Sequence, residues 1–243
     1  MPERAGAAER GERGERGGPQ LIPRPSSARP GPTAPWAHLT REERHVDLSR
    51  VIASLRGAGP PKPSPWEPPV GARRSAVLVP LFEEDAEAWV VLTRRSQHLR
   101  SHKGEVAFPG GRQDDGETLV EAALREAREE IALETSVVEI VGELDHLATV
   151  SSNSSIVPFV GVLPGRPVGL LPNPDEVEAV LVVPLGELLH DGVFRSELWP
   201  WQDETGLLGD RPLYFFDLYG DTIWGATGRM IVNLLEIVLG LPR

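Results

Sequence analysis

The chain has 243 residues and a formal net charge of −11, and it contains no cysteine. This length accommodates one large domain or two small ones. The lack of cysteine excludes disulfide bonds and thiolate chemistry and is typical of a reducing compartment, so we expect a cytoplasmic protein. The acidic balance argues against a partner nucleic acid, and an anionic substrate would need local metal or arginine to hold it.

The first segment of the chain, residues 1–36, is built from Gly, Arg, Glu, Ala, Pro and Ser and nearly lacks large apolar side chains. Such a segment buries too little apolar surface to offset the entropy lost on ordering. We therefore expect a disordered low-complexity tail. No apolar core follows a basic start, so we expect no secretory signal.

Residues 37–73 are expected to contain a helix and a proline-rich connector. Apolar residues recur among charged ones from His38 to Leu55, which predicts an amphipathic helix. Residues 57–69 include the sequence PPKPSPWEPP, which is typical of an extended, turn-rich linker. The main domain then comprises residues 74–243.

This main domain has short apolar runs interleaved with amphipathic segments. Strands are expected at residues 76–82, 88–93, 105–108, 136–150, 156–163, 177–183 and 212–218. Helices are expected at residues 117–132, 185–189 and 225–239. The last of these is too short and too interrupted to span a bilayer, so we expect no membrane association. The order of elements predicts an α+β fold with a central sheet and helices on its faces.

Three carboxylates of the helix at 117–132 fall on one side of it. Glu126, Glu129 and Glu130 are spaced i, i+3 and i+4, and positions three and four apart share a helix face. Clustered carboxylate oxygens suit Mg²⁺ or Mn²⁺. A solvated face with Arg/Glu pairs is the alternative for an isolated helix. The preceding turn at 110–111 and Glu117 at fixed spacing favour the metal site.

Residues 111–133 resemble the Nudix box, G-x5-E-x7-R-E-U-x-E-E-x-G-U, in which U is apolar. The one departure is Ala132, where the family has a glycine. Glycine there would ease a helix-ending positive φ, and alanine costs about 1 kcal/mol. The resemblance implies a Nudix fold, in which a mixed sheet is sandwiched between helices in three layers (α/β/α).

The resemblance also implies roles for individual residues. Glu126, Glu129 and Glu130 would hold Mg²⁺ or Mn²⁺ over a diphosphate and take part in catalysis. Arg125 would orient these carboxylates, and the carbonyl oxygen of Gly110 would add a ligand. The choice of general base stays open among the three glutamates of the box, with Glu105 as a further candidate.

Upstream of the box, residues 91–111 resemble the signature of the coenzyme A pyrophosphatase branch of Nudix hydrolases, L-L-T-x-R-S-x3-R-x3-G-x3-F-P-G-G. Val91 replaces the first leucine, and the other fixed positions match. The resemblance implies that five residues bind the substrate: Arg95, Ser96, Arg100, Gly110 and Gly111. Arg95, Arg100 and Lys103 carry the charge needed to hold phosphate groups, including the 3′-phosphate of coenzyme A. We assign His98 and His102 no catalytic role.

These resemblances imply metal-dependent hydrolysis of the diphosphate of coenzyme A or its derivatives, giving 3′,5′-ADP and 4′-phosphopantetheine, acylated where the substrate was. One alternative is a Nudix hydrolase of ADP-ribose or NADH. Another is a catalytically silent Nudix domain that binds a nucleotide as a sensor. Glu176 or Glu178 is a candidate for an extra carboxylate at the metal site, and the alternative for each is a solvated acid at the end of a strand. The choice between Mg²⁺ and Mn²⁺, the preferred acyl chain and the oligomeric state stay open.

Overall fold

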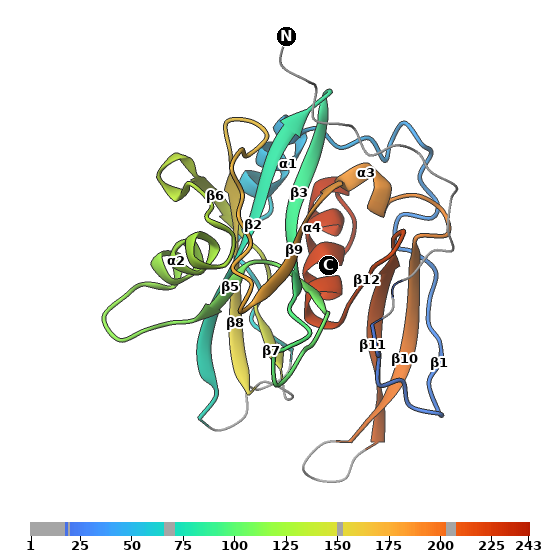
Figure 1. Ribbon diagram of the computed structural model, residues 1–243. Helices are drawn as coiled ribbons and strands as arrows, with labels where there is room; N and C mark the ends of the chain where they lie inside the picture. Colours follow the sequence, from blue (N-terminus) through green and yellow to red (C-terminus); the bar gives the residue numbers. More distant parts are fainter. Residues whose placement is uncertain (1–17, 19, 66–70, 150–152, 203–207) are drawn as a thin grey trace.

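The computed structural model describes residues 18, 20–65, 71–149, 153–202 and 208–243. In this part of the chain, two sheets lie on either side of the C-terminal helix α4 (Gly225–Leu239) (Figure 1). The larger sheet has eight strands here and the smaller one has four. The long apolar side chains of α4 are buried from Met230 to Val238, so this helix is the packed element that the sequence predicts for 225–239.

The larger sheet is mixed, as expected for this fold class. Its strands are β2 (Arg73–Glu84), β3 (Glu87–Arg95), β4 (Val106–Ala107), β5 (Gly110–Arg112), β6 (Glu139–Glu143), β7 (Leu147–Thr149), β8 (Ser154–Val162) and β9 (Val177–Pro184). The main path runs β4-β3-β2-β8-β6, while β5 pairs with β2, β7 with β8 and β9 with β3. Strands β2 and β8 are parallel, and the other pairs are antiparallel.

Helices cover both faces of this sheet, because its central strand is apolar on both sides. Alternate residues of a strand point to opposite faces. Ala76 and Leu78 of β2 pack in one core cluster with helix α2 (Leu119–Ile131), whereas Val79 and Leu81 pack in a second cluster with α4. Helix α1 (Leu48–Gly57) lies on the same side as α4 (Figure 1). The expected sandwich of a mixed sheet between helices is confirmed.

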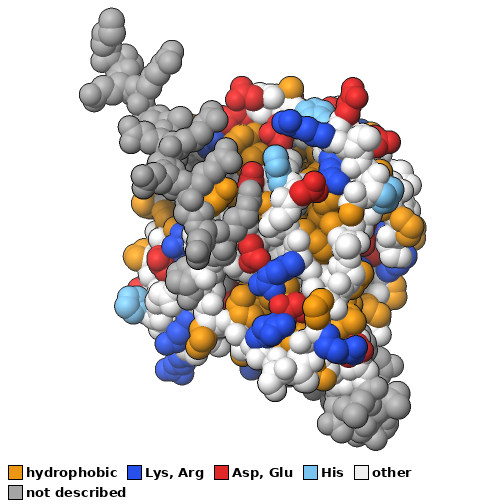
Figure 2. All heavy atoms as spheres, turned by 90° about the vertical axis from the view of Figure 1, so that its right-hand side faces the viewer, with side chains coloured by type: hydrophobic (Ala, Val, Ile, Leu, Met, Phe, Trp, Pro, Cys, Tyr) orange, Lys and Arg blue, Asp and Glu red, His pale blue; other side chains and the backbone are white. Residues whose placement is uncertain are grey.

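The smaller sheet is a feature that the sequence predicts only in part. Its strands are β1 (Arg29–Pro30), β10 (Phe194–Gln202), β11 (Leu208–Asp217) and β12 (Thr222–Trp224), in the order β1-β10-β11-β12. The expected strand at 212–218 corresponds to β11, which begins earlier. On the face of this sheet that turns away from α4, acidic and basic side chains are interspersed with apolar ones (Figure 2).

Several expected boundaries differ from the structure. The backbone N–H of Gly31 donates to the Ser196 carbonyl at 2.9 Å, and Trp36 is buried against Phe194 and Phe216. Residues 20–36 therefore follow a defined path, in contrast to the expected disorder of residues 1–36. Residues 1–17 and 19 of that expected tail lie outside the described residues.

The helix expected from His38 to Leu55 begins at Leu48, because the side chain of Asp47 accepts a hydrogen bond from the Arg50 N–H at 2.7 Å and caps it there. The strand expected at 136–150 is instead a 3₁₀ turn (Thr135–Val137) followed by β6 and β7. Helix α3 (Leu185–Leu188) agrees with the expected short helix. Part of the proline-rich connector, residues 66–70, lies outside the described residues.

Helix α2 is fixed at both ends by local interactions. Thr118 and Glu121 form a capping box, in which the Thr118 hydroxyl accepts from the Glu121 N–H and the Glu121 carboxylate accepts from the Thr118 N–H. At the other end, Ala132 adopts a left-handed conformation with φ of 53°. This is the strained helix end that the departure from the box predicts.

We expect Ala132→Gly to raise the free energy of unfolding by about 1 kcal/mol, because glycine adopts this conformation without the Cβ clash. Ala132 is exposed, so the substitution removes no core contact. Urea unfolding followed by circular dichroism measures the change. Gly240→Ala is the matched control, since Gly240 ends α4 with φ of 68° and open space around it, and it should destabilise by a similar amount. An unchanged unfolding midpoint for Ala132→Gly would contradict the expected strain.

Candidate active site

Three carboxylates converge beside the second half of α2. Glu126 and Glu130 are four residues apart on α2, and Glu176 precedes β9. Each offers one oxygen, and these oxygens lie within 4.8 Å of one another. The loop that carries Glu176 is bound to α2, because the backbone N–H of Asn173 donates to the Glu130 carbonyl at 2.8 Å. We call Glu126, Glu130 and Glu176 the acidic cluster.

Burial makes this cluster electrostatically costly. The side chain of Glu130 is 3% exposed, and burial raises its pKa to about 8. Arg95 opposes this shift from 3.8 Å, while Glu126 and Glu176 add to it. Burial also raises the pKa of Glu126. Carboxyl oxygens clustered in this way match the hard ligands that Mg²⁺ and Mn²⁺ prefer, so the residues fit a divalent cation.

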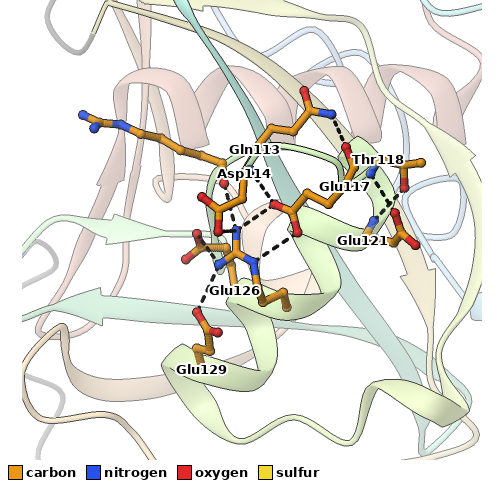
Figure 3. Close-up of polar contacts among 9 residues, drawn as sticks. Gln113, Asp114, Glu117, Thr118, Glu121, Glu126 and Glu129 are labelled. Atoms are coloured by element: carbon orange, nitrogen blue, oxygen red, sulfur yellow. Dashed lines mark hydrogen bonds and ion pairs between the residues drawn. The ribbon is translucent and has the colours of Figure 1, made fainter.

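One guanidinium group, that of Arg125, binds three glutamates, Glu117, Glu126 and Glu129, which are labelled in Figure 3. It donates to Glu126 at 3.0 Å, to Glu129 at 3.0 Å and to Glu117 at 2.9 Å. It also donates to the Arg112 carbonyl oxygen at 2.9 Å. Charge-assisted hydrogen bonds of this kind fix side-chain orientation. Arg125 therefore contacts two of the three box glutamates, and its role in orienting them stays a prediction.

Two candidate ligands lie outside the acidic cluster. The side chain of Glu129 is 54% exposed and accepts from Arg125, so in this structure it faces solvent beside the cluster. Glu178 is on the outer side of β9, where it pairs with Arg94 at 3.4 Å. Of the two acids that the sequence leaves open, Glu176 is the one that lies beside Glu126 and Glu130.

Gly110 and Gly111, expected in a turn, instead begin strand β5, and this segment has no room for side chains. A Cβ on Gly110 would lie 2.4 Å from the Ala76 carbonyl oxygen, and one on Gly111 would lie 2.3 Å from Oε1 of Glu126. The backbone N–H of Gly110 donates to Glu130 at 3.3 Å. The two glycines therefore let the start of β5 approach the acidic cluster closely, with its backbone facing the carboxylates.

The upstream arginine segment is only partly at the site. Arg95 reaches Glu130, as described above. Ser96 is buried, and its N–H donates to the Glu176 carbonyl at 2.8 Å, so its position supports the cluster through the backbone. Arg100 is exposed on the following loop. Glu105 pairs with Nδ1 of His102 at 3.0 Å, and this hydrogen bond raises the pKa of His102.

A cavity of about 1210 Å³ opens beside these residues and extends to the smaller sheet. Its near wall includes Arg95, Glu105 and the glycines Gly110 and Gly111 of β5. These glycines contact the acidic cluster. Its far wall is formed by residues of β10, β11, β12 and α4: Trp199, Trp201, Arg211, Tyr214, Trp224 and Arg229. The space is large enough for a substrate that extends well beyond a diphosphate.

Comparison with known proteins places this site in a family. The NUDIX domain matches residues 72–205, which contain the acidic cluster, Gly110 and Gly111. The chain belongs to the Nudix family.

Several Nudix hydrolases are similar to it in sequence. "Nudix hydrolase 22, chloroplastic" of Arabidopsis thaliana is 39% identical over 70% of this chain and 57% of its own length. "Nudix hydrolase 3" of Caenorhabditis elegans is 47% identical over 47% of this chain and 48% of its own length. The Nudix hydrolase NudL of Yersinia enterocolitica is 36% identical over 73% of this chain and 87% of its own length. The match thus spans only 48–60% of the length of the plant and nematode relatives.

Two parts of this Nudix domain were not anticipated as parts of the site. The capping box of Thr118 and Glu121 has a recognisable spacing, so the sequence could have revealed it. The far wall of the cavity depends on β10 and β12, two strands that the sequence does not predict.

Among the described residues, no helix combines the length and apolar character needed to cross a bilayer.

We expect the metal-free protein to lose stability as the pH rises, because the carboxyl of Glu130 has a pKa of about 8 when folded against an ordinary value of 4.5. The folded state binds this proton more tightly than the unfolded state does. The contribution of the Glu130 carboxyl to the free energy of unfolding is therefore complete below pH 4.5 and is lost as the pH rises through 8. Urea unfolding from pH 5 to 8.5 with EDTA measures this. Glu130→Gln should flatten the profile, whereas Glu139→Gln, at an exposed position of β6, should leave it unchanged. Parallel profiles for all three proteins would contradict the burial effect.

We expect Glu176→Gln to weaken Mn²⁺ binding by about tenfold or more, because it removes an anionic oxygen from the acidic cluster. Glu178→Gln is the matched control, two residues away on the same segment and paired with Arg94 instead. Titration followed by electron paramagnetic resonance of free Mn²⁺ measures both constants. The assignment of Glu176 would be wrong if Glu178→Gln weakened binding and Glu176→Gln did not.

Proposed function

We propose that this Nudix protein hydrolyses the diphosphate bond of coenzyme A or its derivatives, using Mg²⁺ or Mn²⁺. The products are 3′,5′-ADP and 4′-phosphopantetheine, acylated where the substrate was. The observation that carries the proposal is the acidic cluster beside Gly110 and Gly111, two residues that line a cavity extending to the smaller sheet. Membership of the Nudix family supports the class of reaction.

The segment at residues 91–111 supports coenzyme A as the substrate. It carries the pattern of the coenzyme A pyrophosphatase branch, and its Arg95 lines the cavity next to Glu130. Arg95 therefore supplies positive charge where a diphosphate would meet the acidic cluster. Arg100 and Lys103 are exposed on the adjoining loop, from which they bind the peripheral phosphate of the substrate.

In this mechanism, a bound divalent cation neutralises phosphate charge and makes water a better nucleophile near neutral pH. The chain's own residues hold and align the reactants. The acidic cluster and the backbone at Gly110 and Gly111 define where the diphosphate lies. Arg125 keeps Glu126 in place. Binding of the remote phosphates by arginine aligns the scissile bond.

The proton of the attacking water passes to a carboxylate. A bond forms between the water oxygen and one phosphorus, and the bond from that phosphorus to the bridging oxygen breaks, so that the other phosphate leaves. The candidates for the general base are Glu126, Glu129 and Glu130, with Glu105 as a further one. Glu105 lines the cavity but is paired with His102, whereas Glu129 faces solvent beside Arg125.

We expect purified protein with coenzyme A and Mg²⁺ or Mn²⁺ to release 3′,5′-ADP and 4′-phosphopantetheine, detected by chromatography with mass detection. Glu130→Gln should abolish turnover, because it removes charge from the acidic cluster while keeping the size of the side chain. Glu139→Gln serves as the matched control and should retain activity, since that residue lies exposed on β6.

Other substrates give the experiment its alternatives. Cleavage of ADP-ribose or NADH but not of coenzyme A would support diphosphate hydrolysis at this site. It would contradict the assignment of residues 91–111 to coenzyme A binding. Binding of nucleotides without cleavage of any of them would favour a silent sensor. Full activity of Glu130→Gln would reject the acidic cluster as the catalytic centre.

A further inference from the structure

The far wall of the cavity carries a group of aromatic side chains on the smaller sheet. Trp199 of β10 and Trp224 of β12 both line the cavity and are half-buried. Their ring centroids are 6.2 Å apart, with an angle of 41° between the planes. Phe215 of β11 lies behind them and is 1% exposed. The cavity therefore has the acidic cluster near one end and two indole rings on the opposite wall.

Both indole rings are held rigidly. The Trp199 Nε1–H donates to Glu197 at 2.8 Å, and the same carboxylate oxygen accepts from Arg24 at 2.7 Å. The ring of Trp224 is stacked on Phe215, with centroids 6.3 Å apart and planes inclined by 3°. A fixed planar surface loses little side-chain entropy when a ligand binds, and it suits a flat ring better than a flexible aliphatic chain.

Trp224 also offers a polar group. Its Nε1–H is buried and has no hydrogen-bond partner among the residues that the structure describes. A buried donor without a partner costs free energy, which a ligand acceptor can restore. The ring nitrogens of a heteroaromatic base are such acceptors. The stacking surface and the free donor together point to the same class of ligand.

We propose that Trp199 and Trp224 form the binding site for the purine base of a nucleoside diphosphate derivative. The inference rests on the proposed function, because the substrate must reach from the acidic cluster to the smaller sheet. The rings are inclined to each other, so the base stacks on one indole and contacts the edge of the other. The smaller sheet then selects the nucleotide end of the substrate, and the larger sheet holds the diphosphate.

The test compares two probes that differ in the base alone, AMP and ribose 5-phosphate, by isothermal titration calorimetry. The native protein should bind AMP more tightly than ribose 5-phosphate. One of the variants Trp224→Leu and Trp199→Leu should raise the dissociation constant of AMP about 5- to 150-fold, since stacking of one base contributes that much, and the other should raise it less. The dissociation constant of ribose 5-phosphate should stay the same.

Matched variants separate the base site from a general loss of structure. Trp89→Leu is the control, because Trp89 is stacked on Phe82 of the larger sheet and does not line the cavity. It should bind AMP as the native protein does. Trp224→Phe keeps the ring and removes the N–H, so it should weaken AMP binding about 2- to 12-fold. This variant gives a result even where a leucine variant fails to fold.

Several outcomes would overturn the inference. They are equal binding of the two probes by the native protein, unchanged AMP binding in the tryptophan variants, and an equal loss for ribose 5-phosphate. Binding is measured without turnover, so the result is separate from the proposed hydrolysis. A protein that binds AMP through these tryptophans but leaves coenzyme A intact would retain the base site and lose the proposed reaction.

Discussion

The burial and crowding of three carboxyl groups is the constraint on which this site depends. Glu126, Glu130 and Glu176 come within 4.8 Å, and burial holds Glu130 against ionisation. The surroundings counter this cost from several directions: Arg95 faces Glu130, the Gly110 N–H donates to it, and Arg125 binds Glu126. Each of these contacts needs a different element at the right place. The mixed sheet supplies that placement, because β5 and α2 are both packed against β2.

The cavity joins two layers with separate tasks. The larger sheet and α2 present anionic oxygens and backbone N–H groups, which suit metal and phosphate chemistry. The smaller sheet presents aromatic rings, and Phe216 of β11 packs in the same core cluster as helix α4. Helix α4 packs between the sheets and contributes to the far wall through Arg229. Variation in the smaller sheet would therefore change which molecules bind without disturbing the carboxylates.

Local patterns predicted the parts of the structure that local interactions determine. The box helix and the C-terminal helix follow from apolar periodicity, and the positive φ of Ala132 follows from a single substitution in the pattern. The sequence offered Glu176 and Glu178 as added carboxylates but could not decide between them, because fifty residues separate Glu176 from Glu126 and the loop contact at Asn173 brings these two together. Strands β1 and β12 of the smaller sheet were missed because they have only two and three residues, too few for any periodicity.

Strand β1 also protects the molecule from association with itself. It pairs with β10 through the register Arg29↔Leu198 and Pro30↔Glu197, at what would otherwise be the open edge of the smaller sheet. An uncovered edge presents unpaired N–H and C=O groups to any other extended chain. Proline at this position has no N–H to offer, so β1 ends the hydrogen-bonded ladder. A segment that sequence composition assigns to a disordered tail thus covers a sheet edge with which other extended chains could otherwise pair.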